Sequence, residues 1–462
     1  MTNPFQKPLI FTLAFALATI LYWPLLSGTP IWDDWTFWFQ DNVIIGDYSY
    51  WDFWKKFSWP LSNTVQRFLF SLFDHHYTVY HVITLLLHFA NSFLVYIMGK
   101  KLKFESPLWL FLFFLLSPVC AISVGWLIQI KTLLAFFFGI LSFITYLEFF
   151  NNRKWIVTSW IFFLLSVAAK STLITLPIIL LMISYKKLPK LHYLFIIPFF
   201  LISGFGAHRI LTSPVTQEAV ESLTYKIENK KQPISVIKFS VETSGVVQKV
   251  NKSFFVMSLY YYFWQVIIPF DNAPVKGPNH ENPEWIEYMH LFFLICLVGI
   301  FWKDRIALYL IAGHILLFPF VGIIPAPFMI VTWVSDQHLY AVLPAFLAFW
   351  IYLLGRIKFR HNWIIPALFL SYYSYKTFES SHFYKNEYAF YEESLRSNPT
   401  NMAIAYNLAF AYLRTGQLDK SLKVLEDTYN LSQYLPELKN RRFYNYLMIM
   451  YVSLKFPEKM AP

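Results

Sequence analysis

Two adjacent carboxylates, Asp33 and Asp34, follow the first apolar run of the chain, in the segment GTPIWDDWTFWF. Adjacent carboxylates in an aromatic, partly dry setting repel each other, so at least one of them should have a raised pKa. Such a carboxylate can serve as a general base. The alternative is a helix N-cap and a solvated acid beside an aromatic belt at a membrane surface. The aromatic residues that would form the pocket or the belt are Trp32, Trp35, Phe37 and Trp38.

Four basic side chains from distant parts of the sequence are predicted to meet the acidic pair on one face of the molecule. A cluster of cations suits an anionic headgroup, so we expect them to bind the phosphate of a lipid. Taken singly, each could instead be a side chain that extends its charged end to the membrane interface. The four residues are Arg67, Lys131, Lys170 and His338.

Two histidines, His81 and His88, stand seven residues apart on one predicted helix. They share a face but lie about 10.5 Å apart along the axis, too far to share a metal ion. We expect hydrogen bonds within the bundle for both, and we place His81 at the pocket of the acidic pair. The sequence holds no phosphate-binding glycine loop, nucleophile elbow or zinc-ligand spacing, which argues against a nucleotide-driven pump and a serine hydrolase.

The composition predicts that membrane-spanning helices position these residues. Hydrophobic residues make up 57% of the 462 residues and charged residues only 14%, outside the range of soluble globular proteins. The net charge is +11, but the lysines and arginines stand mainly in short loops, so we expect no nucleic-acid partner. The predicted fold class is all-α, a polytopic bundle of about eleven spans. The apolar runs are 8–27, 78–98, 105–118, 131–150, 155–170, 172–185, 191–208, 289–302, 306–324, 339–355 and 363–378.

Every second loop between these runs is basic, which predicts a cytoplasmic N-terminus in a multi-pass inner membrane. The odd number of spans then places the C-terminus outside. Residues 254–270 would break this alternation if they spanned, so we interpret them as an interfacial or re-entrant helix. Two long segments, 28–77 and 209–288, fall on the outer face, and 215–250 is interpreted as a passive connection. The basic loops contain Lys100, Lys101 and Lys103; Arg153 and Lys154; Lys186, Lys187 and Lys190; Lys303 and Arg305; and Arg356, Lys358 and Arg360.

The last part of the chain, 379–462, has the composition of a soluble domain and is predicted to be a separate extracytoplasmic helical domain, with 1–378 forming the membrane domain. Residues 402–435 match the spacing of one tetratricopeptide unit, with Gly416 at the turn between its two helices. Residues 383–396 are predicted to form a leading helix, and YNYLMIMYVSLKF suggests a second pair. The domain is either structural or a groove for an acceptor polypeptide.

The order of these pieces resembles a known family of membrane enzymes. The blocks are WDDW, QRFLFSLFDHHYTVYHVITLLLHFANSFLVY, LLSPVCAISVGWLIQIKTLLAFFFGIL, LLSVAAKSTLITLPIILLM, LYYYFWQVIIPF and SDQHLYAVLPAF. Together with the terminal repeat, they are similar to polytopic glycosyltransferases of the GT-C class. The closest subgroup is the protein O-mannosyltransferase-like enzymes with C-terminal tetratricopeptide repeats.

The resemblance implies a transferase that moves a monosaccharide from a polyprenyl-phosphate donor to an extracytoplasmic acceptor, commonly a protein hydroxyl. It implies that the acidic pair contains the catalytic base, with Arg67 and Lys170 matching the basic residues of the family. Whether Asp33 or Asp34 also holds a divalent cation with the donor phosphate is left open. The sequence departs from the family at Ser117 for a His, Thr132 for an acid, Ser171 for a Glu, and Gln337 and His338 for Arg-Tyr.

Three functions therefore remain after the sequence is read. The first is an inverting sugar transferase that acts on a protein Ser or Thr hydroxyl by general-base catalysis. The second keeps this chemistry but takes a glycan or lipid acceptor. The third is a non-enzymatic transporter or membrane scaffold that recruits partners through the repeat, for which inverted internal symmetry would be the signature.

Overall fold

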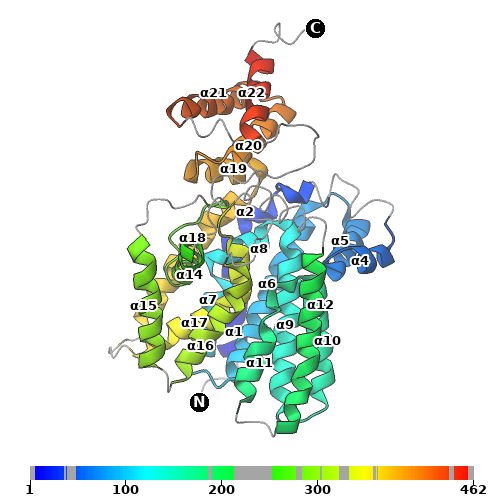
Figure 1. Cartoon of the computed structure of the whole chain (residues 1–462), viewed down its shortest axis with the longest axis vertical. Coiled ribbons are helices and arrows are strands. Elements are labelled where there is room, and N and C mark those ends of the chain that lie inside the picture. The colour runs from blue at the N-terminus through cyan, green and yellow to red at the C-terminus, as the bar shows by residue number, and fades with distance from the viewer. Residues whose placement is uncertain are drawn as a thin grey trace.

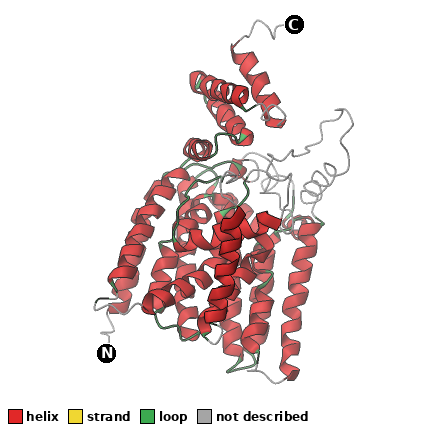
Figure 2. Cartoon of the chain, turned by 60° about the vertical axis from the view of Figure 1, so that its left-hand side comes forward, coloured by secondary structure: helices red, strands yellow, loops and turns green. Residues whose placement is uncertain are grey.

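The computed structural model describes residues 6–35, 38, 48–185, 190–212, 252–276, 284–301, 304–321, 332–356, 361, 363–435 and 442–455. The regular elements of these residues are helices (Figures 1 and 2), which confirms the all-α class for the described part of the chain. Residues 215–250, Phe37, and the loop residues Lys186, Lys187, Lys303, Lys358 and Arg360 lie outside the described residues.

Most of the helices form one bundle, and the last four form a smaller stack at one end of it (Figure 1). The bundle contains α1 (Gln6–Leu21), α2 (Trp23–Leu26), α4 (Tyr50–Lys56), α5 (Pro60–Phe73), α6 (Tyr77–Lys101), α7 (Pro107–Leu115), α8 (Ala121–Gly125), α9 (Ile130–Phe149), α10 (Trp155–Ala169), α11 (Leu176–Ser184), α12 (Ile197–Leu211), α14 (Lys252–Ile267), α15 (Glu284–Ile300), α16 (Arg305–Leu317), α17 (Leu339–Arg356) and α18 (Ile364–Phe383). Short 3-10 helices join several of these: η2 (Pro118–Cys120), η3 (Leu127–Gln129), η4 (Ser171–Leu173), η5 (Lys190–Ile196), η7 (Phe318–Phe320) and η9 (Asp336–His338). The stack contains α19 (Glu387–Ser397), α20 (Met402–Arg414), α21 (Leu418–Tyr434) and α22 (Arg442–Lys455).

Four helical segments of the described chain are long and apolar enough to cross a membrane. They are Tyr77–Lys101, Leu127–Phe149, Tyr193–Leu211 and Asp336–Arg356; the pair Pro107–Leu115 and Pro118–Gly125, bent by 51°, would make a fifth. The predicted count of about eleven is therefore not reproduced. The reason is local: polar or proline residues interrupt the apolar runs, as Lys170 does between α10 and α11. At about 1.5 Å per residue, the 15 residues of α10 and the 9 of α11 are too short to span a bilayer alone.

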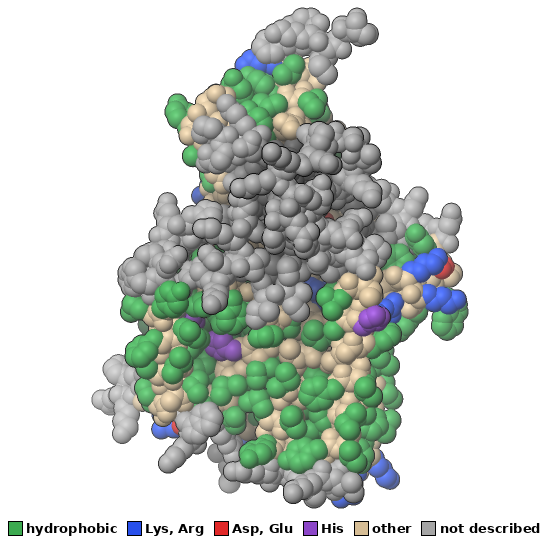
Figure 3. Space-filling view, viewed as in Figure 1, with side chains coloured by type: hydrophobic (Ala, Val, Ile, Leu, Met, Phe, Trp, Pro, Cys, Tyr) green, Lys and Arg blue, Asp and Glu red, His purple; other side chains and the backbone are tan. Residues whose placement is uncertain are grey.

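The helix predicted at 254–270 is α14, and it belongs to the core of the bundle. It packs against α15 and α17 and buries Tyr262, Phe263 and Val266. α14 therefore does not lie on the surface of the bundle, and its position relative to the membrane stays a prediction. Apolar side chains cover the sides of the bundle, and Lys and Arg side chains appear at its lower edge, away from the small stack (Figure 3).

The small stack begins with the predicted leading helix, α19, and continues with the predicted repeat unit, α20 and α21. Gly416 has a φ of 74°, a conformation that favours glycine, and it ends α20 with backbone bonds to the preceding turn. Ser421 Oγ then donates to Ala409 O at 2.8 Å, which fixes the two helices against each other. We call α19–α22 the repeat domain, and the end of the bundle that it contacts the repeat-side end.

The repeat domain is joined to the bundle by a shared apolar core as well as by α18. Tyr384, Phe390 and Ile404 lie in one buried cluster with Leu25 and Ile122 of the bundle. α18 runs through the predicted boundary at 378 without a break and ends at Phe383. Because apolar burial is the main stabilising term in such a contact, we expect the two parts to behave as one body.

Candidate functional site

The acidic pair lies at the repeat-side end, and its two carboxylates have different environments. Asp34 is fully buried, and its two oxygens accept backbone hydrogen bonds from Ile31 N at 3.0 Å and Ile128 N at 2.6 Å. The second bond crosses from the loop after α2 to η3. Asp34 therefore holds the loop in place rather than facing a ligand.

Asp33 is partly exposed and accepts no hydrogen bond within the described part of the chain. The ammonium of Lys131 attracts its negative charge. Burial raises the pKa of Asp33 above its usual value, and the attraction of Lys131 opposes that rise. Burial also raises the pKa of Asp34, against the backbone donors that favour its ionised form. A carboxylate that is free of hydrogen bonds and has a raised pKa is suited to accept a proton.

Replacement of Asp34 with Asn is expected to destabilise the protein, whereas Asp33→Asn should not. Asn offers one oxygen where Asp34 uses two, so one buried N–H would lose its acceptor at a cost of about 1–3 kcal/mol. Thermal unfolding of the two purified variants measures the difference, and the pair is matched in chemistry. Equal melting temperatures would contradict the role of Asp34 in holding the loop through its two backbone hydrogen bonds.

The repeat domain closes over the aromatic residues around the pair. The Trp32 ring lies 5.8 Å from the Phe390 ring and 6.1 Å from the Tyr391 ring, both on α19. The Arg414 guanidinium of α20 lies 5.5 Å from the Trp35 ring centroid. Trp32 also has a φ of 42°, a backbone conformation that is uncommon for non-glycine residues and is often found near functional sites. The site thus has a wall formed by the repeat domain.

Three of the four predicted basic residues are brought together beside Asp33. Lys170 is buried at the end of α10, and its Nζ donates to Thr132 Oγ1 at 2.8 Å and to Gln129 Oε1 at 3.2 Å. Lys131 interacts electrostatically with Lys170 and with Asp33, and His338 interacts with both lysines. We call Lys131, Lys170 and His338 the cationic cluster.

The two lysines of the cationic cluster have no close ion-pair partner in the described part of the chain. No carboxylate lies within 4.0 Å of the Lys170 or Lys131 ammonium among the described residues. The buried hydroxyl groups of Ser171 and Thr172, next to Lys170, also lack a hydrogen-bond partner in the described chain. Buried donors of this kind, next to an unpaired cation, fit an oxyanion such as phosphate.

Arg67, the fourth predicted basic residue, contacts α4. Its guanidinium stands over the rings of Tyr50 and Phe53, at 5.2 and 5.8 Å, and so joins α5 to α4. Ser62, near the start of α5, lies close to Lys170, because its Oγ donates to the carbonyl oxygen of the preceding residue, Ala169, at 2.7 Å. Arg67 is five residues further along α5, about 7.5 Å away along the axis.

The two histidines of α6 differ. His88 is hydrogen-bonded within the bundle, as predicted, through Tyr340 OH at 2.8 Å and Leu115 O at 3.0 Å. His81 is equally buried, but neither of its ring nitrogens has a hydrogen-bond partner among the residues that the structure describes. It lies beneath Gly28, where an added Cβ would stand 2.9 Å from His81 Nε2. His81 therefore supports the loop that carries the acidic pair.

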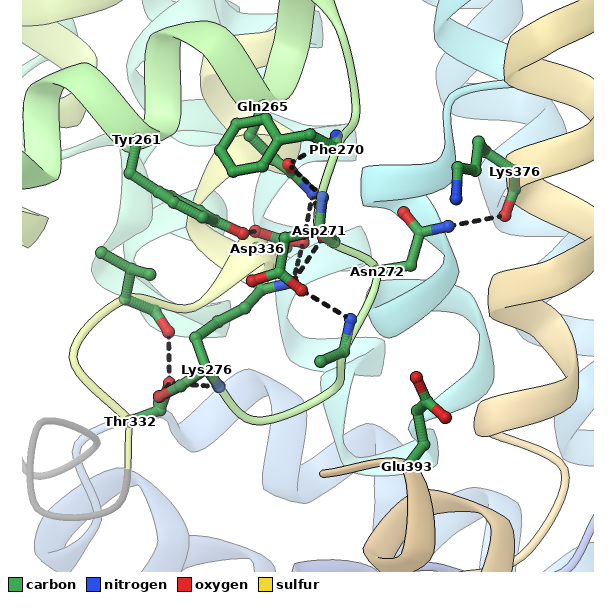
Figure 4. Close-up of polar contacts among 12 residues, drawn as sticks. Tyr261, Gln265, Phe270, Asp271, Asn272, Lys276, Thr332, Asp336, Lys376 and Glu393 are labelled. Atoms are coloured by element: carbon green, nitrogen blue, oxygen red, sulfur yellow. Dashed lines mark hydrogen bonds and ion pairs between the residues drawn. The ribbon is translucent and has the colours of Figure 1, made fainter. Parts of the chain in front are cut away.

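A buried ion-pair network was missed by the sequence reasoning (Figure 4). Lys276 is 2% exposed, and its Nζ lies 3.2 Å from Asp336 Oδ2 and 3.5 Å from Asp271 Oδ1. Gln265 Nε2 donates to the same Asp336 oxygen at 3.3 Å. Because Asp336 begins the short helix that ends at His338, the network anchors that part of the cationic cluster. Asp336 stands more than fifty positions after Gln265, Asp271 and Lys276, so no local sequence pattern indicates the network.

A large cavity lies within the bundle, and neither Asp33 nor any residue of the cationic cluster lines it. Its volume is about 1160 Å³. Leu173 and Ala341, each three residues from a member of the cluster, line it near the repeat-side end. Lys103 and Arg153 line it at the other end. Between them the walls are mainly apolar, from Phe136, Ile140, Leu176, Ile179, Leu308, Ala312, Leu316 and Ala348.

Comparison with known proteins identifies the C-terminal part. A family model of the tetratricopeptide repeat matches residues 390–423. The C-terminal helices contain a tetratricopeptide repeat. The match overlaps the predicted unit, 402–435, and extends into α19, so the repeat includes the helix that faces Trp32. Neither the curated proteins nor the solved structures gave a significant match to the chain.

The described residues alone do not form a metal site. Among the described residues, no group of three or more His, Cys, Asp or Glu side chains could hold a metal ion. Asp33 is the one member of the acidic pair without a hydrogen bond in that part of the chain. A divalent cation at Asp33 would therefore need oxygens from the donor phosphate as further ligands.

Proposed function

We propose that the chain is a membrane-bound glycosyltransferase that moves a monosaccharide from a polyprenyl-phosphate donor to an acceptor hydroxyl outside the cytoplasm. The proposal is carried by one carboxylate, Asp33, that accepts no hydrogen bond in the described part of the chain and interacts with Lys131, which in turn interacts with Lys170. The order of the sequence blocks, which resembles that of the GT-C class, supports the same function. In this proposal the repeat-side end faces outward and the N-terminus is cytoplasmic.

The proposed reaction is a single displacement at the anomeric carbon. The acceptor oxygen attacks that carbon, and the bond from the carbon to the phosphate oxygen breaks with its electron pair. Asp33 takes the proton of the acceptor hydroxyl, and the polyprenyl phosphate leaves. Lys131, Lys170 and His338 stabilise the negative charge that develops on the leaving phosphate. Attack opposite to the leaving group inverts the anomeric configuration.

The apolar cavity would hold the isoprenoid chain of the donor. In this proposal the phosphate sits at the cationic cluster, close in sequence to Leu173 and Ala341 of the cavity wall, and the isoprenoid chain extends between α9, α11, α16 and α17. We expect Ala312→Phe, which narrows the cavity, to raise the apparent KM for a long-chain donor by about tenfold, because lost apolar burial costs about 0.8 kcal/mol per CH₂. A water-soluble short-chain donor is the control and should be used normally. Equal effects on both donors would contradict this placement.

The acceptor would approach between the repeat domain and the acidic pair. The wall formed by Trp32, Phe390 and Tyr391 is aromatic, and Asp33 stands beside it. A protein Ser or Thr hydroxyl is the acceptor that best explains a polypeptide-binding type of repeat at this place. A glycan or lipid acceptor remains an outcome that mass spectrometry of the product distinguishes.

We expect the rate of sugar transfer to rise with pH. A general base works only when it is unprotonated, so kcat/KM should rise with pH through the pKa of Asp33. Burial raises that pKa above its usual value, so the rising limb should lie above about pH 4. Asp33→Glu should keep a rising limb, and Asp33→Asn should lose it. A wild-type profile that is already flat at about pH 4 would contradict the assignment.

A further inference from the structure

The hairpin formed by α4 and α5 projects sideways from the bundle at its repeat-side end (Figure 1). Its outward side chains are large and apolar: Trp51 is 73% exposed, Phe68 53% and Leu72 56%. Tyr50 and Trp54 are also exposed. Lys55 and Lys56 lie exposed beside them, and Figure 3 shows basic and hydrophobic side chains together on this projection. We call these residues the hairpin face.

Both helices are firmly held on their other side. Phe53, Ser62, Gln66 and Leu69 are buried, and Arg67 lies over two rings of α4. A capping box between Ser49 and Asp52 starts α4. The exposed apolar residues are therefore a fixed surface and not a consequence of loose packing. Large apolar side chains that are held exposed side by side indicate an interaction site.

The level of the hairpin is set by its contacts with helix ends. The Arg209 guanidinium donates to Trp54 O at 3.0 Å and also to Phe57 O. Arg209 lies at the end of the segment Tyr193–Leu211, which is long enough to span a membrane. Ser62 is bonded at the end of α10 in the same way. The hairpin thus begins at the level where the segment Tyr193–Leu211 would leave the bilayer.

We propose that the hairpin face is an anchor that inserts into the outer surface of the lipid bilayer, with Lys55 and Lys56 bound to anionic headgroups. Tryptophan and tyrosine prefer the interface between headgroups and acyl chains, and lysine extends its charge to the headgroups. An amphipathic segment with a basic edge binds such a surface. The proposal rests on the membrane location proposed above. Since the start of α5 contacts the cationic cluster's neighbourhood, the anchor also fixes one side of the donor site.

Site-directed spin labelling in lipid nanodiscs tests the anchor. In a background with Cys120→Ala and Cys296→Ala, single cysteines are placed at Trp51, Leu72, Leu201 or Tyr434 and labelled. Leu201 is 68% exposed within the segment Tyr193–Leu211 and reports on the bilayer, whereas Tyr434 is 83% exposed on the repeat domain and reports on water. Collision rates with oxygen, which dissolves in lipid, and with a water-soluble nickel chelate are measured.

The expected result is that labels at Trp51 and Leu72 collide with oxygen more than with the chelate, as at Leu201 and unlike Tyr434. Labels at Trp51 and Leu72 that behave like Tyr434, with Leu201 in lipid, would overturn the anchor alone. Labels there that are shielded from both reagents would indicate a protein contact and would also overturn it. A label at Leu201 in water would instead contradict the membrane location.

Binding of Lys55 and Lys56 to anionic headgroups is tested by comparing two lipid compositions. Lys55→Gln with Lys56→Gln should reduce the immersion of the Trp51 label in discs that contain phosphatidylglycerol. The same variant in discs of phosphatidylcholine alone should match the unsubstituted protein. An equal effect in both lipids would overturn the role of anionic headgroups.

Discussion

Replacement of Asp33 with Asn is expected to lower the rate of sugar transfer by about 10²- to 10⁴-fold, the usual contribution of a general base. Asn nearly preserves the volume of the side chain but removes the oxygen that accepts the proton. Because Asp33 accepts no hydrogen bond in the described structure, its replacement should leave the melting temperature unchanged. The rate is measured with a labelled polyprenyl-phosphate sugar and purified protein in bilayers.

The matched control for this variant is Asp419→Asn, an exposed acid on the repeat domain. It should transfer sugar at the wild-type rate. A wild-type rate for Asp33→Asn would remove the catalytic assignment. A loss of activity in Asp34→Asn alone would exchange the two roles, which the braced geometry of Asp34 argues against.

Replacement of Lys170 with Gln is expected to have two effects of opposite sign. Donor use should weaken by about 10- to 100-fold, because a charge-assisted hydrogen bond to phosphate is worth about 1.5–3 kcal/mol. The protein without donor should become more stable to heat, because a buried ammonium without a carboxylate partner is costly. Gln can keep a hydrogen bond to Thr132 or Gln129 and adds no charge.

Donor titration and thermal unfolding of the same preparations measure the two effects. Lys154→Gln, an exposed lysine in the loop between α9 and α10, is the control and should change neither quantity. A structural role for Lys170 would instead lower both stability and activity. That result would contradict phosphate binding by the cationic cluster.

The sequence predicted the positions of the candidate site residues better than it predicted the number of membrane-spanning helices. Asp33 and Asp34 could be found from their position after an apolar run, and the alternation of basic loops placed Lys131, Lys170 and His338 at the same end. The structure brings those three residues together. The difference between the environments of the two acids, in contrast, depends on the backbone of η3, which no sequence pattern specifies.

The failures of the sequence reasoning have physical causes. Hydropathy does not show where a polar residue such as Lys170 ends a helix, so apolar runs were taken as full spans. Arg67 was predicted to lie at the phosphate from the topology as well as from the resemblance, whereas in the structure its guanidinium contacts rings of α4 within the hairpin. The network of Lys276 with Asp336 joins distant segments, and long-range pairs leave no periodic signal.

The most direct test of the proposed sugar transfer is to identify both products that are formed from the donor. Wild-type protein in bilayers is incubated with a defined polyprenyl-phosphate sugar and an acceptor polypeptide, and both products are analysed by mass spectrometry. We expect polyprenyl phosphate and sugar-bearing polypeptide in equal amounts, with inverted anomeric configuration by NMR. Donor that stays intact with wild-type protein, across protein, glycan and lipid acceptors, would contradict the account.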